Sequence, residues 1–203
     1  MATVPEATPQ REVLLRYTDG AILLHWLMAA LVVVQVWIGF TFHNMPRGPE
    51  RADMFLWHKT VGATILMLAI IRLIWRLLHK PPPFPEDLPH WERIAAVWNH
   101  RIFYALLIVI PLTGLSAVSG GAEEAMTPLK FGLALPVIPG LSEAAGDLFG
   151  GAHEALVKLT IALLVIHVAA ALKHQFIDRA RVAGRMPPFR APGGIEARPR
   201  DDV

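Results

Sequence analysis

The chain has 203 residues, of which 54% are hydrophobic, and its mean hydropathy is +0.42. This is too apolar for an ordinary soluble domain and predicts a membrane protein. The absence of cysteine excludes disulfides, thiolate zinc sites, cysteine-held iron–sulfur clusters and covalent c-type haem, and a net charge of +2 gives no sign of nucleic-acid binding.

Four apolar runs are long enough to cross a hydrocarbon core about 30 Å thick. They predict an all-α membrane protein in which four transmembrane helices form an up-down-up-down bundle, with spans at residues 20–42, 54–79, 98–119 and 151–178. Pro111 and Gly114 predict a kink in the third span. Connectors rich in Pro, Gly and charged residues separate the spans.

Lys and Arg are concentrated on one side of the predicted membrane: near the N-terminus, in the loop after the second span, and just after the fourth span. By the positive-inside rule, both termini are expected in the cytoplasm. The sequence thus divides into a cytoplasmic N-terminal segment (1–19), a four-helix transmembrane domain (20–178) and a cytoplasmic tail (179–203). The Arg, Pro and Gly content of the tail predicts disorder.

The fourth span carries His153 and His167 on one face. Fourteen residues separate them, so they lie about 21 Å apart along the helix axis and about 40° apart around it. The direction of each span puts His58 at the depth of His153 and His25 at the depth of His167. The four histidines are therefore predicted to form one pair near each side of the membrane. Each of them alone is also consistent with a packed, hydrogen-bonded histidine.

Two imidazoles with no carboxylate or thiolate beside them fit few cofactors. Zinc usually takes four ligands and copper is an alternative, but a b-type haem with two axial histidines fits the pattern best. Gly62, one turn after His58, leaves space for a flat ring. Arg72 at the inner level and Lys59 at the outer level are expected to pair with haem propionates.

Two further histidines lie close to the predicted sites. His100 begins the third span, where it is expected to contact a lipid headgroup or a propionate. His174 follows His167 by two helical turns and lies near the cytoplasmic surface. It is positioned either to hydrogen-bond a quinone carbonyl or to serve as an ordinary interfacial histidine.

Six segments, taken in order, carry a likeness to a known family. They are L-H-W at 24–26, W-H-K-T-V-G at 57–62, R-L-I-W-R-L at 72–77, H-R-I-F-Y-A-L-L-I-V-I-P-L-T-G at 100–114, F-G-L-A-L-P at 131–136, and the run from 153 to 174 that begins and ends in histidine. Together they cover most of residues 15–188. With the two fourteen-residue spacings, they make the chain resemble the bacterial cytochrome b-561 family of two-haem, four-helix membrane proteins.

The resemblance implies that His58 and His153 bind the iron of one haem and that His25 and His167 bind the iron of the other. It also implies a ubiquinone site near His174 and a location in the bacterial inner membrane. The likeness extends to the superoxide oxidase branch of the family. The chain departs from that branch at Gln175, where the branch carries a second histidine.

The sequence and the resemblance together predict a diheme b-type oxidoreductase that moves single electrons across the membrane. In the leading hypothesis, superoxide gives electrons to the outer haem, and the inner haem passes them to ubiquinone. In the alternative, the chain is a haem-bearing electron-transfer subunit that serves a periplasmic or membrane redox partner. Both hypotheses place the protein in membrane lipid, and neither fixes its oligomeric state.

Overall fold

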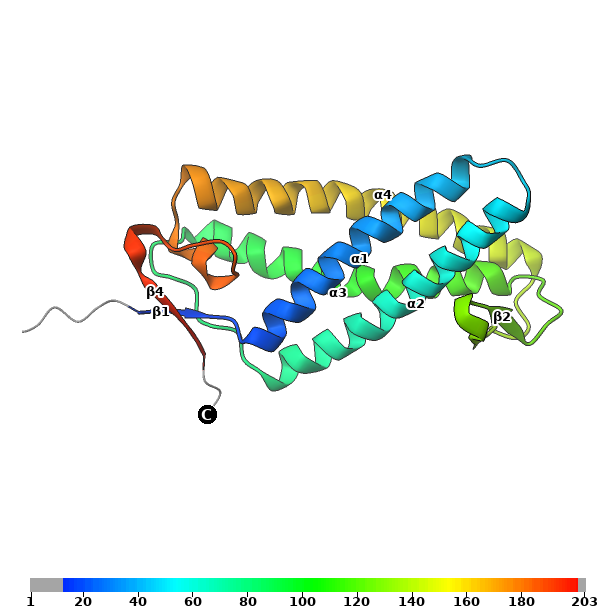
Figure 1. Cartoon of the computed structure of the whole chain (residues 1–203), viewed down its shortest axis with the longest axis horizontal. Coiled ribbons are helices and arrows are strands. Elements are labelled where there is room, and N and C mark those ends of the chain that lie inside the picture. Colours follow the sequence, from blue (N-terminus) through cyan, green and yellow to red (C-terminus); the bar gives the residue numbers. More distant parts are fainter. Residues whose placement is uncertain (1–12, 201–203) are drawn as a thin grey trace, which may run out of the picture.

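Four long helices dominate the computed structural model, which describes residues 13–200 (Figure 1). They are α1 (Asp19–Asn44), α2 (Pro49–Leu78), α3 (His90–Ser119) and α4 (Glu143–Leu172), and α4 continues into a π-helical turn, Lys173–Ile177. Each is long and apolar enough to cross a membrane. The prediction of an all-α protein with four transmembrane helices is confirmed.

Three helices begin several residues earlier than the apolar pattern predicts. α2 begins at residue 49 rather than 54, α3 at 90 rather than 98, and α4 at 143 rather than 151. The added turns contain charged residues, so hydropathy does not mark them as part of a span. The start of α4 is fixed locally by Ser142, whose hydroxyl accepts a hydrogen bond from the backbone N–H of Ala145 at 3.2 Å.

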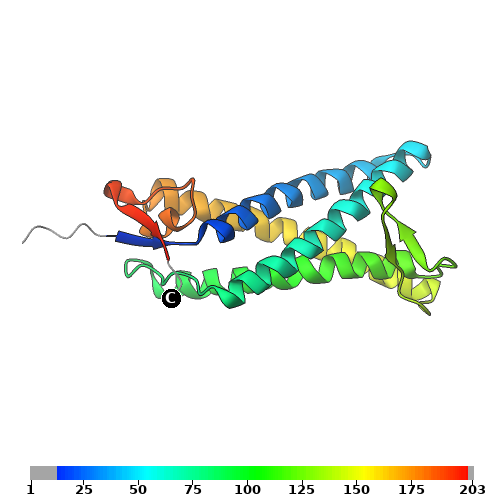
Figure 2. The same ribbon diagram turned by 60° about the horizontal axis from the view of Figure 1, so that its bottom comes forward.

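The helices pack mainly as two neighbouring pairs, α1 with α2 and α3 with α4, and α2 also contacts α3 (Figure 2). α3 and α4 meet at two glycines. A Cβ built on Gly120 would lie 2.4 Å from the Cα of Gly146, so only glycine permits this backbone contact. Small residues allow helices in lipid to approach closely, where there is no hydrophobic effect to press them together.

Large apolar side chains cover the outside of the bundle. Leu23, Val33 and Val165 have relative exposures of 68%, 62% and 63%. The buried apolar set within the helices is small and consists of Met28, Ile38, Ile65, Ala69 and Leu106. This outward distribution suits a chain whose surroundings are lipid rather than water.

A short hairpin covers one end of the bundle, which we call the hairpin end. Its strands, β2 (Met126–Pro128) and β3 (Ala134–Pro136), are antiparallel, and a 3₁₀ turn, η1 (Lys130–Gly132), joins them. Two lysines fasten the hairpin to α2. Lys130 pairs with Asp53 at 2.6 Å, and Lys59 donates to the hydroxyl of Thr127 at 2.8 Å.

The opposite end, which we call the terminal end, carries both described ends of the chain (Figure 1). There β1 (Val13–Arg16) pairs in parallel with β4 (Glu196–Pro199). Two ends on one side agree with an even number of spans. That this side faces the cytoplasm remains a prediction from the distribution of Lys and Arg.

Residues 179–200 fold against the terminal end, unlike the disordered tail that their composition predicts. Arg185 is only 3% exposed. Its guanidinium lies 5.3 Å from the ring centre of Tyr17 and 4.8 Å from that of Phe84, and it donates a hydrogen bond to the carbonyl of Pro82. A cation held between aromatic rings stabilises such a contact without a large apolar core.

The tail contains two 3₁₀ turns, η3 (Arg181–Arg185) and η4 (Pro192–Gly194). Two more hydrogen bonds hold it against the bundle. The indole N–H of Trp26 donates to the carbonyl of Pro187 at 2.6 Å. Arg200 donates to the carbonyl of Pro81 at 2.7 Å. Composition misses this order because the acceptors are backbone carbonyls of prolines, two of them in a distant loop.

Candidate functional site

Two pairs of histidines face one another across the bundle. The rings of His58 and His153 have centres 6.1 Å apart with an interplanar angle of 78°. The rings of His25 and His167 have centres 6.4 Å apart with an angle of 60°. The first pair joins α2 to α4 toward the hairpin end, and the second joins α1 to α4 toward the terminal end. The structure thus brings together the residues that depth alone paired.

α3 orients both histidines of α4. The Nδ1 of His153 lies 2.9 Å from the backbone carbonyl of Ile110, which fixes it as the protonated nitrogen. The amide nitrogen of Asn99 lies 2.9 Å from the Nδ1 of His167, and exchanging the amide nitrogen and oxygen would let the oxygen accept the Nδ1–H instead. The contact of His153 leaves its Nε2 with a free lone pair, which is the arrangement that metal-binding histidines use. His167 has the same arrangement when the amide oxygen of Asn99 faces the ring.

His58 is held by α1. The side-chain amide of Gln35 donates to the backbone carbonyl of His58 at 3.0 Å and lies 3.4 Å from its Nε2. Gly39 presents only backbone to the ring, since a Cβ there would lie 3.4 Å from Cε1. The Nδ1 of His58 is buried without a hydrogen-bond partner among the described residues. Such an atom marks a site whose bonding the protein alone does not complete.

A cavity of about 470 Å³ lies at the level of His58 and His153. This volume is in the range of small-molecule and cofactor sites. Most of its lining is aliphatic or aromatic, and it approaches bare backbone at Gly39, Gly62 and Gly114. Lys59 also lines it, with its ammonium bonded to Thr127 of the covering hairpin. A flat, largely apolar group fits these surroundings.

The surroundings of the other pair are tighter and more polar. Arg72 lies inside the bundle, with Nη2 3.0 Å from the Nδ1 of His25. The ring centre of His100 lies 5.7 Å from that of His167, and Phe103 also contacts His167 at 5.5 Å. A bulky group between His25 and His167 requires these neighbouring side chains to move.

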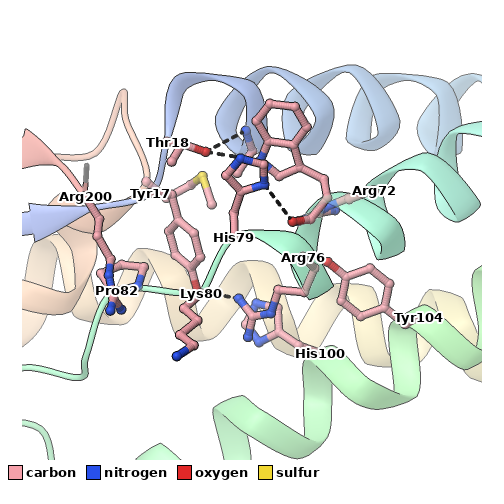
Figure 3. A pocket seen from close by; sticks show the side chains of 13 residues that line it. Tyr17, Thr18, Arg72, Arg76, His79, Lys80, Pro82, His100, Tyr104 and Arg200 are labelled. Atoms are coloured by element: carbon pink, nitrogen blue, oxygen red, sulfur yellow. Dashed lines mark hydrogen bonds between the residues drawn. The ribbon is translucent and has the colours of Figure 1, made fainter. Parts of the chain in front are cut away.

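A small cavity of about 40 Å³ adjoins this level at the terminal end (Figure 3). Among the described residues that line it none is acidic, and four are cationic: Arg72, Arg76, Lys80 and Arg200. Tyr17 adds a hydroxyl, which accepts from Arg76 at 3.4 Å. Cations gathered without carboxylates stabilise a carboxylate or another anionic group placed among them.

The spacing of each pair suits one metal centre. Metal bonds to imidazole nitrogen are about 2 Å long, so two facing rings need about 4 Å between their nitrogens plus the ring radii. Centre separations of 6.1 and 6.4 Å meet that condition. Within residues 13–200 no three His, Asp or Glu side chains gather as a metal site. Each pair therefore suits a group that brings its other ligands, as haem does.

Residues 16–188 match the family model of prokaryotic cytochrome b561. The chain belongs to this family. It is accordingly a membrane electron-transfer protein that binds b-type haem, and it lies in the bacterial inner membrane as a multi-pass protein. The resemblance inferred from the six sequence segments is confirmed.

Curated relatives agree with the family. This cytochrome is 30% identical over 181 residues to cytochrome b561 homolog 2 of Escherichia coli (strain K12), covering 84% of this chain and 90% of that protein. It is 25% identical to the probable superoxide oxidase CybB of Yersinia pestis, covering 85% and 96%. It is 24% identical to a cytochrome b562 of Cereibacter sphaeroides, covering 84% and 94%.

Sequence reasoning missed the neighbours of the histidines. Gln35 and Asn99 were recoverable in part, since an uncharged polar residue within an apolar span generally faces other protein groups. The backbone carbonyl of Ile110 and the bare backbone of Gly39 carry no such signal, because their roles depend on which helix lies opposite.

The structure places the remaining predicted residues as follows. Gly62 lines the larger cavity, and a Cβ there would lie 3.2 Å from the side chain of Gln35. His100 lies in the terminal-end cavity and not at a lipid-facing surface. His174 lies in the π-helical turn at the terminal end and contacts two carboxylates. No described contact joins it to the two histidine pairs.

Proposed function

We propose that the cytochrome holds two b-type haems, one through His58 and His153 and one through His25 and His167. The observation that carries this proposal is the similar spacing of two imidazole pairs, 6.1 and 6.4 Å, at two depths of one bundle. When bound, haem supplies one-electron redox chemistry that no side chain of this chain provides. The protein supplies ligation, tautomer control and charge.

The chain contributes different charges at the two levels. At the hairpin level the cavity lining includes Lys59, Lys158 and one acid, Glu154, which pairs with Lys158 at 2.7 Å. At the terminal level the four-cation cavity stabilises the propionates of a group bound between His25 and His167. Arg72 then exchanges its contact with His25 for a carboxylate. An arginine this deep in a span is stable only when paired.

The reaction we propose is oxidation of superoxide at the hairpin end and reduction of ubiquinone at the terminal end. Two superoxide anions each lose one electron and leave as dioxygen, and one quinone takes up two electrons and two protons. The likeness to a probable superoxide oxidase supports this donor. Lys59 at the hairpin-end cavity supports it as well, because a cation attracts an anionic substrate.

A stopped-flow experiment tests the proposal. Pulsed superoxide is mixed with the purified holoprotein and a soluble quinone, and the decay of superoxide is followed together with the appearance of quinol. We expect decay faster than spontaneous dismutation and dependent on the quinone. Lys59→Met should slow the decay of superoxide. The difference in rate between wild type and Lys59→Met should shrink at high salt, because ions screen the attraction between Lys59 and superoxide. Decay at the spontaneous rate would reject the superoxide reaction.

The tip of the β2–β3 hairpin favours a second function. Phe131 is 77% exposed and Leu133 59% exposed, and these side chains form an apolar tip that a periplasmic redox partner could cover. In that case the chain is an electron-transfer subunit and reacts slowly with superoxide. A stoichiometric partner that copurifies, and whose release Phe131→Ser promotes, would support this function.

A further inference from the structure

A cluster of charged side chains surrounds His174 where α3 begins and α4 ends. The Nδ1 of His174 lies 3.0 Å from Oδ2 of Asp178, and its Nε2 lies 3.9 Å from Oε2 of Glu92. Lys173 bridges the same two carboxylates, at 2.6 Å to Asp178 and 3.3 Å to Glu92. The imidazole therefore has a carboxylate on each of its two nitrogens.

The cluster lies farther toward the terminal end than the pair of His25 and His167. His174 follows His167 by seven residues, which in a helix is about 10 Å along the axis and within about 20° of the same face. The intervening chain enters a π-helical turn at Lys173, a distortion that is frequent at functional sites. A small molecule between the two levels would be close to the electron-carrying pair and to His174 at once.

The two carboxylates have different environments. The hydrogen bond from Lys173 lowers the pKa of Asp178, so this carboxylate stays ionised at neutral pH and accepts the Nδ1–H of His174. That bond leaves Nε2 as the exchanging nitrogen. Glu92 faces Nε2 at 3.9 Å, and both side chains keep a partial contact with water, with 11% of Glu92 and 19% of His174 exposed. Asp178 thus orients the ring, and Glu92 faces its reactive side.

We propose that Glu92 and Asp178 make His174 the proton-delivery group for the quinone, with Glu92 collecting protons from the cytoplasmic water and Asp178 fixing the tautomer. The inference rests on the proposed quinone reduction. Each of the two protons that a quinone takes up passes from Glu92 to Nε2 of His174 and then to a quinone oxygen. Glu92 regains its proton from water, so the cluster returns to its starting state each time.

Further charged groups adjoin the cluster on α3 and in the tail. On α3, Arg93 follows Glu92 and donates to the carbonyls of Leu88 and Glu86. η3 packs against the π-helical turn and contributes Arg181 and Arg185, the second of which is directed to the carbonyl of Pro82. Gln175 accepts the backbone N–H of Arg190 at 2.9 Å, which ties the tail to the same turn. The described acids in contact with His174 are Glu92 and Asp178.

The test separates proton delivery from electron transfer. Holoprotein is reduced with dithionite, freed of reductant, and mixed with either a soluble quinone or ferricyanide, and the haem bands report reoxidation. Quinone needs protons, whereas ferricyanide takes only an electron. We expect Glu92→Gln to slow reoxidation by quinone about tenfold or more at pH 8, as loss of a proton-transferring group does, and to leave the ferricyanide rate unchanged. The deficit should shrink toward pH 6, because bulk protons then replace Glu92.

Three further variants decide between roles. Glu86→Gln, an exposed acid in the loop before α3, is the matched control and should match the wild type. His174→Gln should reproduce the Glu92→Gln defect. Lys173→Gln removes both lysine ion pairs but keeps the carboxylates, so it should slow reoxidation by quinone less than Glu92→Gln does. An equal defect would mean that the cluster only holds α3 and α4 together.

The outcomes keep the two proposals distinct. A wild-type protein that ferricyanide reoxidises but quinone does not would reject the proposed quinone reduction. A wild-type protein that quinone reoxidises, with Glu92→Gln equally fast at pH 8, would reject the proton-delivery role alone. Variants that also lose the ferricyanide reaction or the haem spectrum would contradict the inference, because the residues would then be structural.

Discussion

Each of the four paired imidazoles depends on a different neighbour for its orientation. His153 contacts the backbone carbonyl of Ile110, and His167 contacts the side-chain amide of Asn99. His58 contacts Gln35 and the backbone of Gly39, and His25 contacts Arg72. These contacts decide which nitrogen faces the gap between the rings. The variants that matter most at this scale are therefore the histidines and the few side chains that hold them.

Loss of one axial histidine should remove one haem. For His153→Ala, we expect the haem content to fall from two per chain to one, since His25 and His167 lie at a separate depth. Pyridine haemochrome and protein assays measure this ratio. His90→Ala, an exposed histidine at the start of α3, is the control. Retention of both haems, or loss of both, would contradict the pairing.

Asn99 offers a test that leaves the ligands in place. In Asn99→Leu the partner of His167 Nδ1 is lost, so the ring is no longer held in one tautomer. Removing such a partner typically weakens metal binding by about 10–100-fold. Haem titration into the apoprotein should show this loss for one site and not for the other. Asn44→Leu, at the exposed end of α1, should bind haem normally; an unaffected Asn99→Leu would show that the amide does not orient His167.

At the scale of elements, the bundle depends on where backbones touch. α3 and α4 meet at Gly120 and Gly146 near the hairpin end, and α3 also holds both histidines of α4. The glycine contact therefore helps to set the distance at which α3 can reach α4. α1 and α2 form the other neighbouring pair, and the imidazoles bridge the space between the pairs.

A methyl group at the glycine contact should destabilise the bundle. The Cβ of Gly120→Ala would lie 2.4 Å from the Cα of Gly146, and backbone cannot give way as a flexible side chain does. Overpacking of this kind costs about 1–3 kcal/mol. Thermal unfolding in detergent, followed by circular dichroism, should show a lower midpoint. Gly151→Ala, with nothing within 4 Å of its Cβ, is the control; equal midpoints would refute the contact.

At the scale of the whole molecule, the two ends of the bundle are closed in different ways. A hairpin held by Lys59 and Lys130 covers the hairpin end. The tail covers the terminal end by joining β1, Trp26 and the loop before α3. The matched family region stops at residue 188, so β4 and Arg200 lie beyond it.

Deletion of residues 189–203 should loosen the terminal end without removing the histidine pairs. It removes β4 and the bond from Arg200 to the carbonyl of Pro81. We expect faster protease cleavage in the loop between α2 and α3. Arg198→Ala, which removes only contacts to Glu196 two residues away, is the control. Cleavage as slow as in the full chain would show that the tail does not restrain this loop.

Apolar runs and residue spacings are enough to predict the four spans, the depth of each histidine and the pairing at each level. Those features follow from local quantities, because apolar length fixes a span and a rise of about 1.5 Å per residue fixes depth along it. The same arithmetic placed Arg72 beside His25 before any packing was known.

The surroundings of the histidines depend on contacts between segments that are distant in sequence. Asn99 lies 68 residues from His167 in sequence, and Glu92 lies 81 from Lys173, so no periodicity relates them. The same holds for the tail. Its composition predicts disorder, but Arg185 and Arg200 donate to the carbonyls of Pro82 and Pro81. Contacts between distant segments depend on helix rotation and crossing, which a span pattern leaves undetermined.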